Sequence, residues 1–175
     1  MSKSIEKINE RSDRMIKFFN SQMGKELKNF AKIAYVRWLN GRIINVQRGS
    51  IELECYIRPD MANPVNLLHG GIQCGMLDNA IGMVVATLGY EGFPISIDFH
   101  VDFIGKVKIE ENVKVIGKII HEGRNILHTV AEIHDMKGNL ISTCNSKLLL
   151  TQLTPIYVKE VDRISKINDH SKFQS

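Results

Sequence analysis

The segment from Asn63 to Asp78 combines residue types that suit acyl-transfer chemistry. It reads Asn63-Pro-Val-Asn-Leu-Leu-His69-Gly70-Gly71-Ile-Gln-Cys-Gly-Met-Leu-Asp78. Two consecutive glycines at a helix start leave backbone N–H groups sterically open at the positive end of the helix dipole. These groups could stabilise a carbonyl oxygen that gains negative charge during attack. The glycines could equally serve only a tight turn or close packing.

Asp78 and His69 are the titratable groups of this segment. Asp78 interrupts an apolar run from Gly70 to Leu88, which predicts a long helix surrounded by protein. A carboxylate is costly there unless it has hydrogen-bond partners, an altered pKa or a water-filled pocket. Asp78 could bond a neighbouring loop, or it could act as a general base or nucleophile. His69 could cap the helix, contact a ligand or have a structural role.

Helix geometry restricts how Gly70 and Asp78 could act on one substrate. They are eight residues apart in the sequence, which is about 12 Å along a helix axis. A reacting carbon must lie within about 3.5 Å of its nucleophile while its oxygen meets the N–H donors. Two antiparallel copies of the helix could place Gly70 of one opposite Asp78 of the other. An enzyme of this kind would be an obligate dimer with two equivalent sites.

The flanking elements predict an α+β domain in which a sheet wraps the 70–88 helix. A loop is expected at 59–68, and short turns join the later strands, unlike the βαβ order of a parallel sheet. An antiparallel sheet must bury one face, and the 70–88 helix is the one apolar enough to fill it. Strands are expected at 42–47, 50–58, 94–104, 112–121, 125–135 and 139–150.

The run 94–104 alternates apolar and polar residues, which predicts a strand with two different faces. The polar face, with Ser96 and His100, would meet solvent, a partner or a site. The apolar face would belong to the core and comprises Ile95, Ile97, Phe99, Val101 and Phe103.

Length and charge indicate one domain with an added arm. The chain has 175 residues and a net charge of +4, of which residues 1–38 carry +5 and the remainder −1. A nucleic-acid-binding domain would carry the excess itself, so the charge argues against nucleic acid as a partner. We expect an amphipathic N-terminal helical extension at 1–37, with a break at Gly24, packed on a domain at 38–155. A polar tail is expected at 156–175, loosely attached from Lys159 onward.

Cysteine content and hydropathy predict a cytoplasmic protein without disulfides or a metal site. Cys55, Cys74 and Cys144 are odd in number and lie in apolar patterns, as buried thiols do. The first residues lack the apolar centre of a secretory signal. Asp78 lies within the longest apolar run, and an aspartate is costly near the centre of a bilayer, so no stable membrane insertion is expected.

The pattern Asn-x5-His-Gly-Gly, with Asp nine residues after the His, resembles the hotdog-fold acyl-CoA thioesterases of the phenylacetyl-CoA thioesterase (PaaI-like) type. The similarity extends from about Trp38 to Thr151, and therefore leaves out most of the arm and the tail. It includes Arg58-Pro-Asp-Met-Ala-Asn63, Ser96-Ile-Asp-Phe-His100, Gly123-Arg124 and residues 135–140. The resemblance implies the hotdog fold, an antiparallel sheet wrapped around a long central helix.

The resemblance also implies a role for each matching position. Asp78 would attack the thioester or activate water, and Ser96 would help to hold that water. The Gly70 N–H would polarise the thioester carbonyl with help from Asn63, and His69 would position the loop beside the thioester. In such enzymes Gly70 and Asn63 come from one subunit, and Asp78 and Ser96 from the other.

Coenzyme A brings phosphates, and the turn Gly123-Arg124-Asn125 resembles the place where this family meets the nucleotide. Arg124 could pair with a phosphate and the turn N–H groups could assist, or the turn could merely be solvated. Asn66 stands where the family usually has glycine. Because Asn tolerates left-handed backbone angles, the loop could keep its shape.

These observations favour hydrolysis of an acyl-CoA to a carboxylic acid and coenzyme A in a homodimer, with two dimers expected to form a tetramer. No metal or cofactor is expected, because coenzyme A is part of the substrate and brings its own leaving thiolate. The alternative is a non-catalytic acyl-CoA-binding or sensor protein. Asp78 argues against it, since binding alone gains little from a buried carboxylate. A hotdog dehydratase is disfavoured, because its paired His and acid motif is missing.

Overall fold

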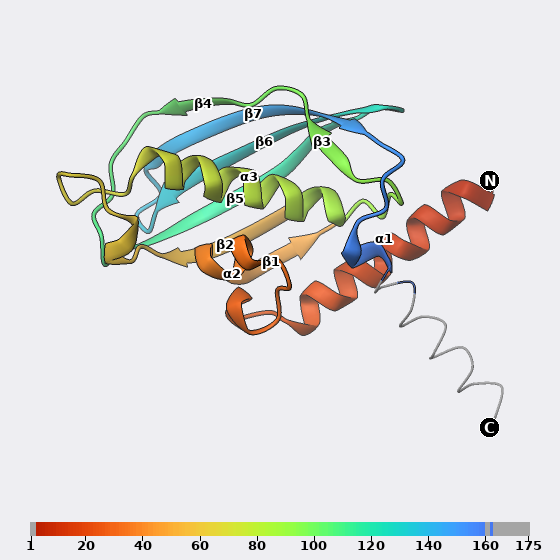
Figure 1. The fold of residues 1–175 in the computed structure, drawn as a ribbon, viewed down its shortest axis with the longest axis horizontal. Coiled ribbons are helices and arrows are strands. Elements are labelled where there is room, and N and C mark those ends of the chain that lie inside the picture. The colour runs from red at the N-terminus through yellow and green to blue at the C-terminus, as the bar shows by residue number, and fades with distance from the viewer. Residues whose placement is uncertain (1–2, 160–161, 163–175) are drawn as a thin grey trace.

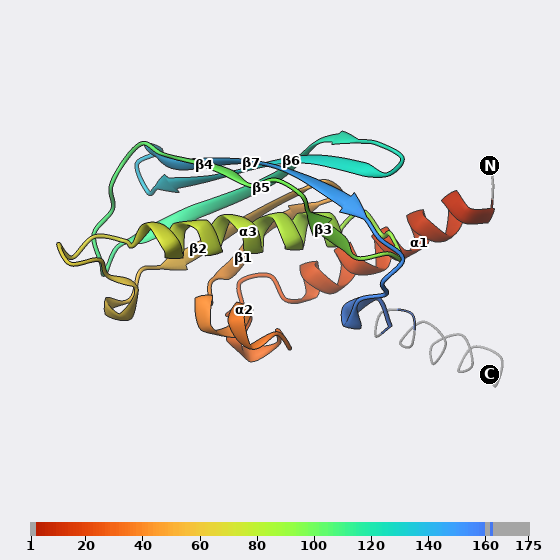
Figure 2. The same cartoon turned by 45° about the horizontal axis from the view of Figure 1, so that its top comes forward.

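The computed structural model describes residues 3–159 and 162, and contains a curved sheet with one long helix on its inner side (Figures 1 and 2). The sheet order is β1-β2-β5-β6-β7-β3, with β4 also on β7, and the described pairings are antiparallel. The α+β prediction is confirmed. The elements are α1 (Lys3–Ser21), η1 (Leu27–Asn29), α2 (Ala34–Leu39), β1 (Arg42–Gln47), β2 (Ser50–Tyr56), η2 (Pro59–Met61), α3 (Gly70–Ala86), β3 (Pro94–Ser96), β4 (His100–Phe103), β5 (Asn112–Glu122), β6 (Ile126–Asp135) and β7 (Leu140–Leu150).

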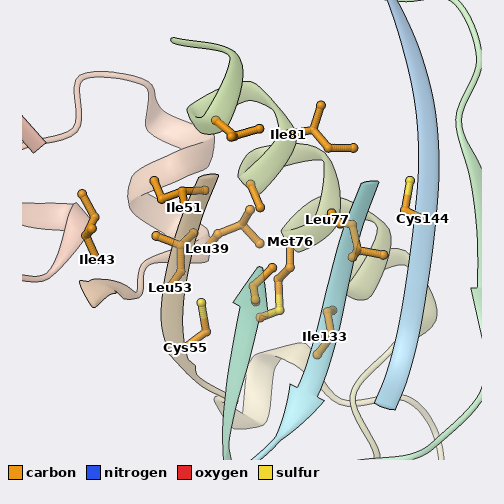
Figure 3. Close-up of a cluster of buried hydrophobic side chains, with 14 of the residues drawn as sticks. Leu39, Ile43, Ile51, Leu53, Cys55, Met76, Leu77, Ile81, Ile133 and Cys144 are labelled. Carbon is orange, nitrogen blue, oxygen red and sulfur yellow. The ribbon is translucent and has the colours of Figure 1, made fainter. Parts of the chain in front are cut away.

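Helix α3 fills the concave side of the sheet. Its inward side chains Leu77, Ala80 and Val84 are fully buried. Helix and sheet approach closely at Gly117 of β5, where a Cβ would lie 2.9 Å from the Ala80 carbonyl oxygen. Side chains of α3 meet those of β2 and β6 in the core shown in Figure 3: Met76, Leu77, Ile81, Leu53 and Ile133.

The β1–β2 hairpin fixes the C-terminal end of α3. Gly49 in its turn has φ +77, a backbone angle that favours glycine. The Gly49 N–H donates to Oγ1 of Thr87 at 2.9 Å, and Thr87 directly follows α3. The C-terminal end of the helix is therefore positioned by the turn of this hairpin.

The run 94–104 departs from the prediction of one strand with a core face. It forms β3 and β4, which both pair with β7, and Asp98 between them accepts the N–H of Lys147 at 2.6 Å. A single helix cannot cover the whole sheet, and α3 contacts mainly β5, β6 and β2, so the sheet extends past it at this edge. Four residues that were predicted to lie in the core are therefore exposed. Their exposed fractions are 43% for Ile95, 55% for Ile97, 37% for Phe99 and 55% for Phe103.

The N-terminal arm packs on the rest of the chain, as predicted. Met15 and Phe19 of α1 are buried. Oγ of Ser12 donates to the Thr87 carbonyl at 2.6 Å, close to the end of α3. Helix α1 ends at Ser21, and Gly24 has φ +75 in the connection that follows.

Most of the tail predicted at 156–175 lies outside the described residues. Val158 is buried, and the Asp162 carboxylate pairs with Arg11 at 3.1 Å and with Arg14 at 3.0 Å. Ion pairs therefore hold Asp162 on α1, and the attachment of the rest of the tail stays a prediction. The domain boundaries at 37 and 155 stay predictions.

Replacing Gly89 by alanine is expected to loosen α1. Gly89 has φ +79, and a Cβ there would overlap two backbone atoms of α1, the Ile8 carbonyl oxygen and the Ser12 nitrogen. Gly24→Ala is the matched control, since Gly24 has φ +75 and nothing within 4 Å of that position. In urea unfolding, Gly89→Ala should cost at least about 2 kcal/mol more than the control, which carries only the backbone strain. Equal costs would contradict this contact.

Candidate active site

The start of α3 presents backbone N–H groups. His69 is the N-cap residue, and its Nδ1 accepts the Gly71 N–H at 2.9 Å. A neutral imidazole that accepts at Nδ1 carries its proton on Nε2. Gly70 is the first helical residue, so its N–H has no partner within the helix. Of the roles open to His69, capping is the one observed, and the Gly70 N–H can serve a ligand.

Asn63 holds the loop that leads into α3. Its Oδ1 accepts the N–H groups of Val65 and Leu67, both at 3.0 Å. Its backbone N–H donates to the Leu67 carbonyl at 2.8 Å. Asn66 has φ +59, the left-handed conformation that it was predicted to tolerate. The loop therefore uses the amide oxygen of Asn63 and not its NH2 group.

Asp78 lies on a side of α3 that the sheet does not cover. Gly71, Gly75, Asp78 and Gly82 share this side because they follow at helical spacings, and we call it the open face. Asp78 is exposed, which corrects the prediction of a helix surrounded by protein, since the sheet wraps only one side of α3. Partial burial still raises the pKa of its carboxyl above the usual 3.8.

One chain does not bring all predicted catalytic groups together. Helix α3 is unbroken between Gly70 and Asp78, so the two lie about 12 Å apart along its axis. Ser96 is exposed on β3, opposite Leu148 of β7. Within the described residues, no hydrogen bond joins Ser96 to Asp78. The single chain therefore offers two partial sets, one at the helix start and one on its open face.

The turn predicted to meet coenzyme A lies near the opposite end of α3. Tyr90, shortly after the helix, donates to the Glu122 carboxylate at 2.9 Å. The Gly123 N–H donates to the Ile126 carbonyl at 3.0 Å, so it is already used within the turn. Arg124 is exposed, as a phosphate-binding side chain must be. Hydrogen bonds from Arg48 at 2.8 and 2.7 Å lower the pKa of Glu122 and counterbalance its charge.

The cysteines show no sign of a redox or metal centre. All three are free thiols, and burial raises the pKa values of Cys55 and Cys144 to about 12. Cys74 is only half-buried, because it borders the uncovered side of α3.

Across the described residues, His, Cys, Asp and Glu side chains nowhere gather in a group that could hold a metal ion. None of the described helices has the length and hydropathy needed to cross a bilayer.

Two aromatic side chains at the site were missed by sequence reasoning. Phe103, expected in the core, lies over Gly70, where a Cβ would be 3.4 Å from its ring. Tyr35 of α2 lies against Gly75 in the middle of α3. An isolated glycine inside a helical pattern often marks a close contact, so Gly75 was the available signal.

A long helix wrapped by an antiparallel sheet, with open N–H groups at its start, is the architecture of the hotdog fold. The family model of the thioesterase superfamily matches residues 66–142 of this chain. This segment of the chain is similar to that superfamily, and the predictions of the hotdog fold and of a resemblance to PaaI-like thioesterases are confirmed. Thioester hydrolysis is the activity for which the superfamily is named, so the prediction of a thioester hydrolase is confirmed at the level of the family.

Individual relatives are distant. Human acyl-coenzyme A thioesterase 13 is 19% identical over 101 residues, which cover 57% of this chain and 72% of that protein. A phenylacetic acid degradation-related thioesterase from Ralstonia eutropha is 24% identical, with a TM-score of 0.64 over 80% of this chain and 99% of that one. A thioesterase protein from Streptococcus pneumoniae, solved with coenzyme A, is 17% identical with a TM-score of 0.61, over 66% of this chain and 92% of that one.

Two substitutions at Asn63 should separate its oxygen from its NH2 group. Asn63→Ala removes the acceptor of two loop N–H groups, and we expect it to lower the free energy of unfolding by about 1–2 kcal/mol. Asn63→Asp keeps an acceptor oxygen, so its unfolding should stay within about 0.5 kcal/mol of wild type. Denaturant unfolding of both variants measures this, and an equally large loss in Asn63→Asp would show that the oxygen is not what holds the loop.

Proposed function

We propose that the chain hydrolyses an acyl-CoA thioester to a free carboxylic acid and coenzyme A. The observation that carries this proposal is that α3 combines an available Gly70 N–H at its start with an accessible carboxylate, Asp78, on its open face. The similarity to human acyl-coenzyme A thioesterase 13 supports the substrate class. The related streptococcal protein solved with coenzyme A supports binding of the leaving group.

Asp78 supplies the base or the nucleophile. As a base, its carboxylate takes a proton from water while the water oxygen bonds to the thioester carbon. As a nucleophile, it bonds to that carbon itself, and water releases the acid in a second step. In both routes the C–S bond breaks and coenzyme A leaves as the thiolate, which ends as the thiol by taking up the proton released from water. The Gly70 N–H donates to the carbonyl oxygen as it gains charge, the Asn63 NH2 group adds a donor, and the Ser96 hydroxyl holds the water.

The two halves of this machinery come from two copies of the chain. Strand β4 and the segment that leads into it lie at the edge of the sheet and expose apolar side chains, among them Ile97 and Phe103 at 55% each. An exposed apolar edge strand favours pairing with another strand. Pairing with a second copy would set two α3 helices against each other, so that Gly70 of one meets Asp78 of the other. Two such dimers would form the tetramer.

Arg124 is proposed to meet a phosphate of coenzyme A. It lies at the exposed β5–β6 turn, and the neighbouring acid Glu122 is held by Arg48 and Tyr90. This pairing removes the repulsion that a free Glu122 would exert on an anion. Hydrolysis changes no oxidation state, and the proposed N–H donor and carboxylate supply the oxyanion site and the base, so the proposal includes neither a metal nor a redox cofactor.

Asp78→Asn is expected to reduce thiol release from an acyl-CoA by about 100-fold or more, as loss of a positioned base or nucleophile does. The variant should be as stable as wild type in urea or slightly more so. Burial raises the pKa of the Asp78 carboxyl, so its ionised form is disfavoured in the folded chain and is lost in the variant. Near-wild-type turnover would contradict the role of Asp78. Acyl-CoA binding by wild type without any turnover would support the sensor alternative.

The pH profile gives a second readout of the same group. Because the carboxylate is the active form, kcat/KM should fall as the pH decreases through the raised pKa of Asp78, at a pH above 3.8. The residual activity of Asp78→Asn should lack this acid limb. An identical acid limb in the variant would assign it to another group.

A further inference from the structure

Tyr35 reaches the open face of α3 between Gly71 and Asp78. A Cβ on Gly75 would overlap Tyr35 Oη and lie 3.1 Å from its Cζ, so the phenol occupies the space that a side chain would fill. Gly75 lies one turn before Asp78 and one turn after Gly71. By contrast, a Cβ on Gly82 would have no atom within 4 Å.

The phenol of Tyr35 lies one helical turn from Asp78 and has an altered pKa. Burial, followed by the negative charges of Asp78 and Cys74, raises the pKa of Tyr35 above 10.0. Tyr35 is nevertheless 48% exposed. Its ring is therefore near Asp78 and still has surface available for a ligand.

Helix α2 holds Tyr35 in place. The rings of Tyr35 and Trp38 are stacked, with centroids 6.3 Å apart and planes at 17°. The Arg58 guanidinium lies 5.1 Å from the centroid of Trp38 and donates to the Leu39 carbonyl at 3.2 Å. Arg58 also pairs with Asp60 through two hydrogen bonds of 3.0 and 3.1 Å. Arg58, which precedes the loop leading into α3, thus fixes the helix that carries Tyr35.

Resting on the proposed function, we propose that Tyr35 is a selectivity residue whose ring forms a wall of the acyl site and limits the length of the acyl group. The wall belongs to the N-terminal arm and not to the segment that matches the thioesterase family model. Acyl groups that extend from Asp78 toward the helix start meet the phenol at Gly75. The arm therefore restricts this chain to short acyl groups.

Thiol release from acetyl-, hexanoyl- and palmitoyl-CoA tests this assignment. Tyr35→Ala should raise the kcat/KM ratio of palmitoyl-CoA to acetyl-CoA by about tenfold or more, since pocket contacts of this size carry such discrimination. Tyr35→Phe keeps the ring and should keep the wild-type ratio. Tyr56→Ala is the matched control, because Tyr56 is 49% exposed and lies on β2.

Gly75→Ala provides an independent route to the same change. Its Cβ would overlap Tyr35 Oη and so displace the ring from α3, and the variant alone should shift the ratio in the same direction. Added to Tyr35→Ala, it should cause no further shift, because the ring that it displaces is gone.

The outcomes separate this inference from the proposed function. If wild type releases thiol, and Tyr35→Ala folds with an unchanged kcat/KM ratio of palmitoyl-CoA to acetyl-CoA, the role of Tyr35 is contradicted. The proposed function stands in that case. If Tyr35→Ala does not fold, an unchanged kcat/KM ratio in Gly75→Ala contradicts the role of Tyr35. If wild type releases no thiol from any of the three substrates, the proposed function fails, and the selectivity role of Tyr35 fails with it.

Discussion

The burial of α3 against one side of the sheet is the interaction on which the rest of the molecule depends. Leu77, Ile81 and Val84 are almost completely buried, and each such side chain contributes about 1.5–3 kcal/mol when removed from water. These contacts fix the rotation of the helix about its own axis. The sheet can wrap only one side of a single helix, so the opposite side stays open, and Asp78 lies there. Ordinary packing, without backbone strain, makes this carboxylate accessible.

The same packing accounts for the uncovered edge of the sheet. Strands β3 and β4 and the segment between them lie at this edge, and apolar side chains there, such as Ile95 and Ile97, stay exposed in the described chain. A second copy paired at this edge would cover them, and it would also supply the helix start that a single site needs. The proposed dimer would thus cover the exposed apolar edge of the sheet, and it would also bring the two halves of the site within reach of one substrate.

Local patterns predicted the elements and the loop. The helix expected at 70–88 is observed from Gly70 to Ala86, and Asn66 has the left-handed angle that its residue type permits. Alternation in 94–104 revealed an apolar face but could not show what covers it, because a core and a subunit interface bury similar side chains. Tyr35 was missed because its contact with Gly75 joins distant parts of the chain, and no local periodicity encodes such a contact.

Mixing two inactive variants tests most directly whether the site is shared between subunits. Asp78→Asn removes one half of the site. Gly70→Pro removes the N–H of the other half at a first helical position where proline is favoured, after His69 with extended angles of φ −62 and ψ 136. After subunit exchange at equal amounts, shared sites should restore about a quarter of wild-type thiol release, because half of the dimers then carry one intact site of two. If tagged subunits show that mixed dimers form and no activity returns, the two halves do not come from different chains.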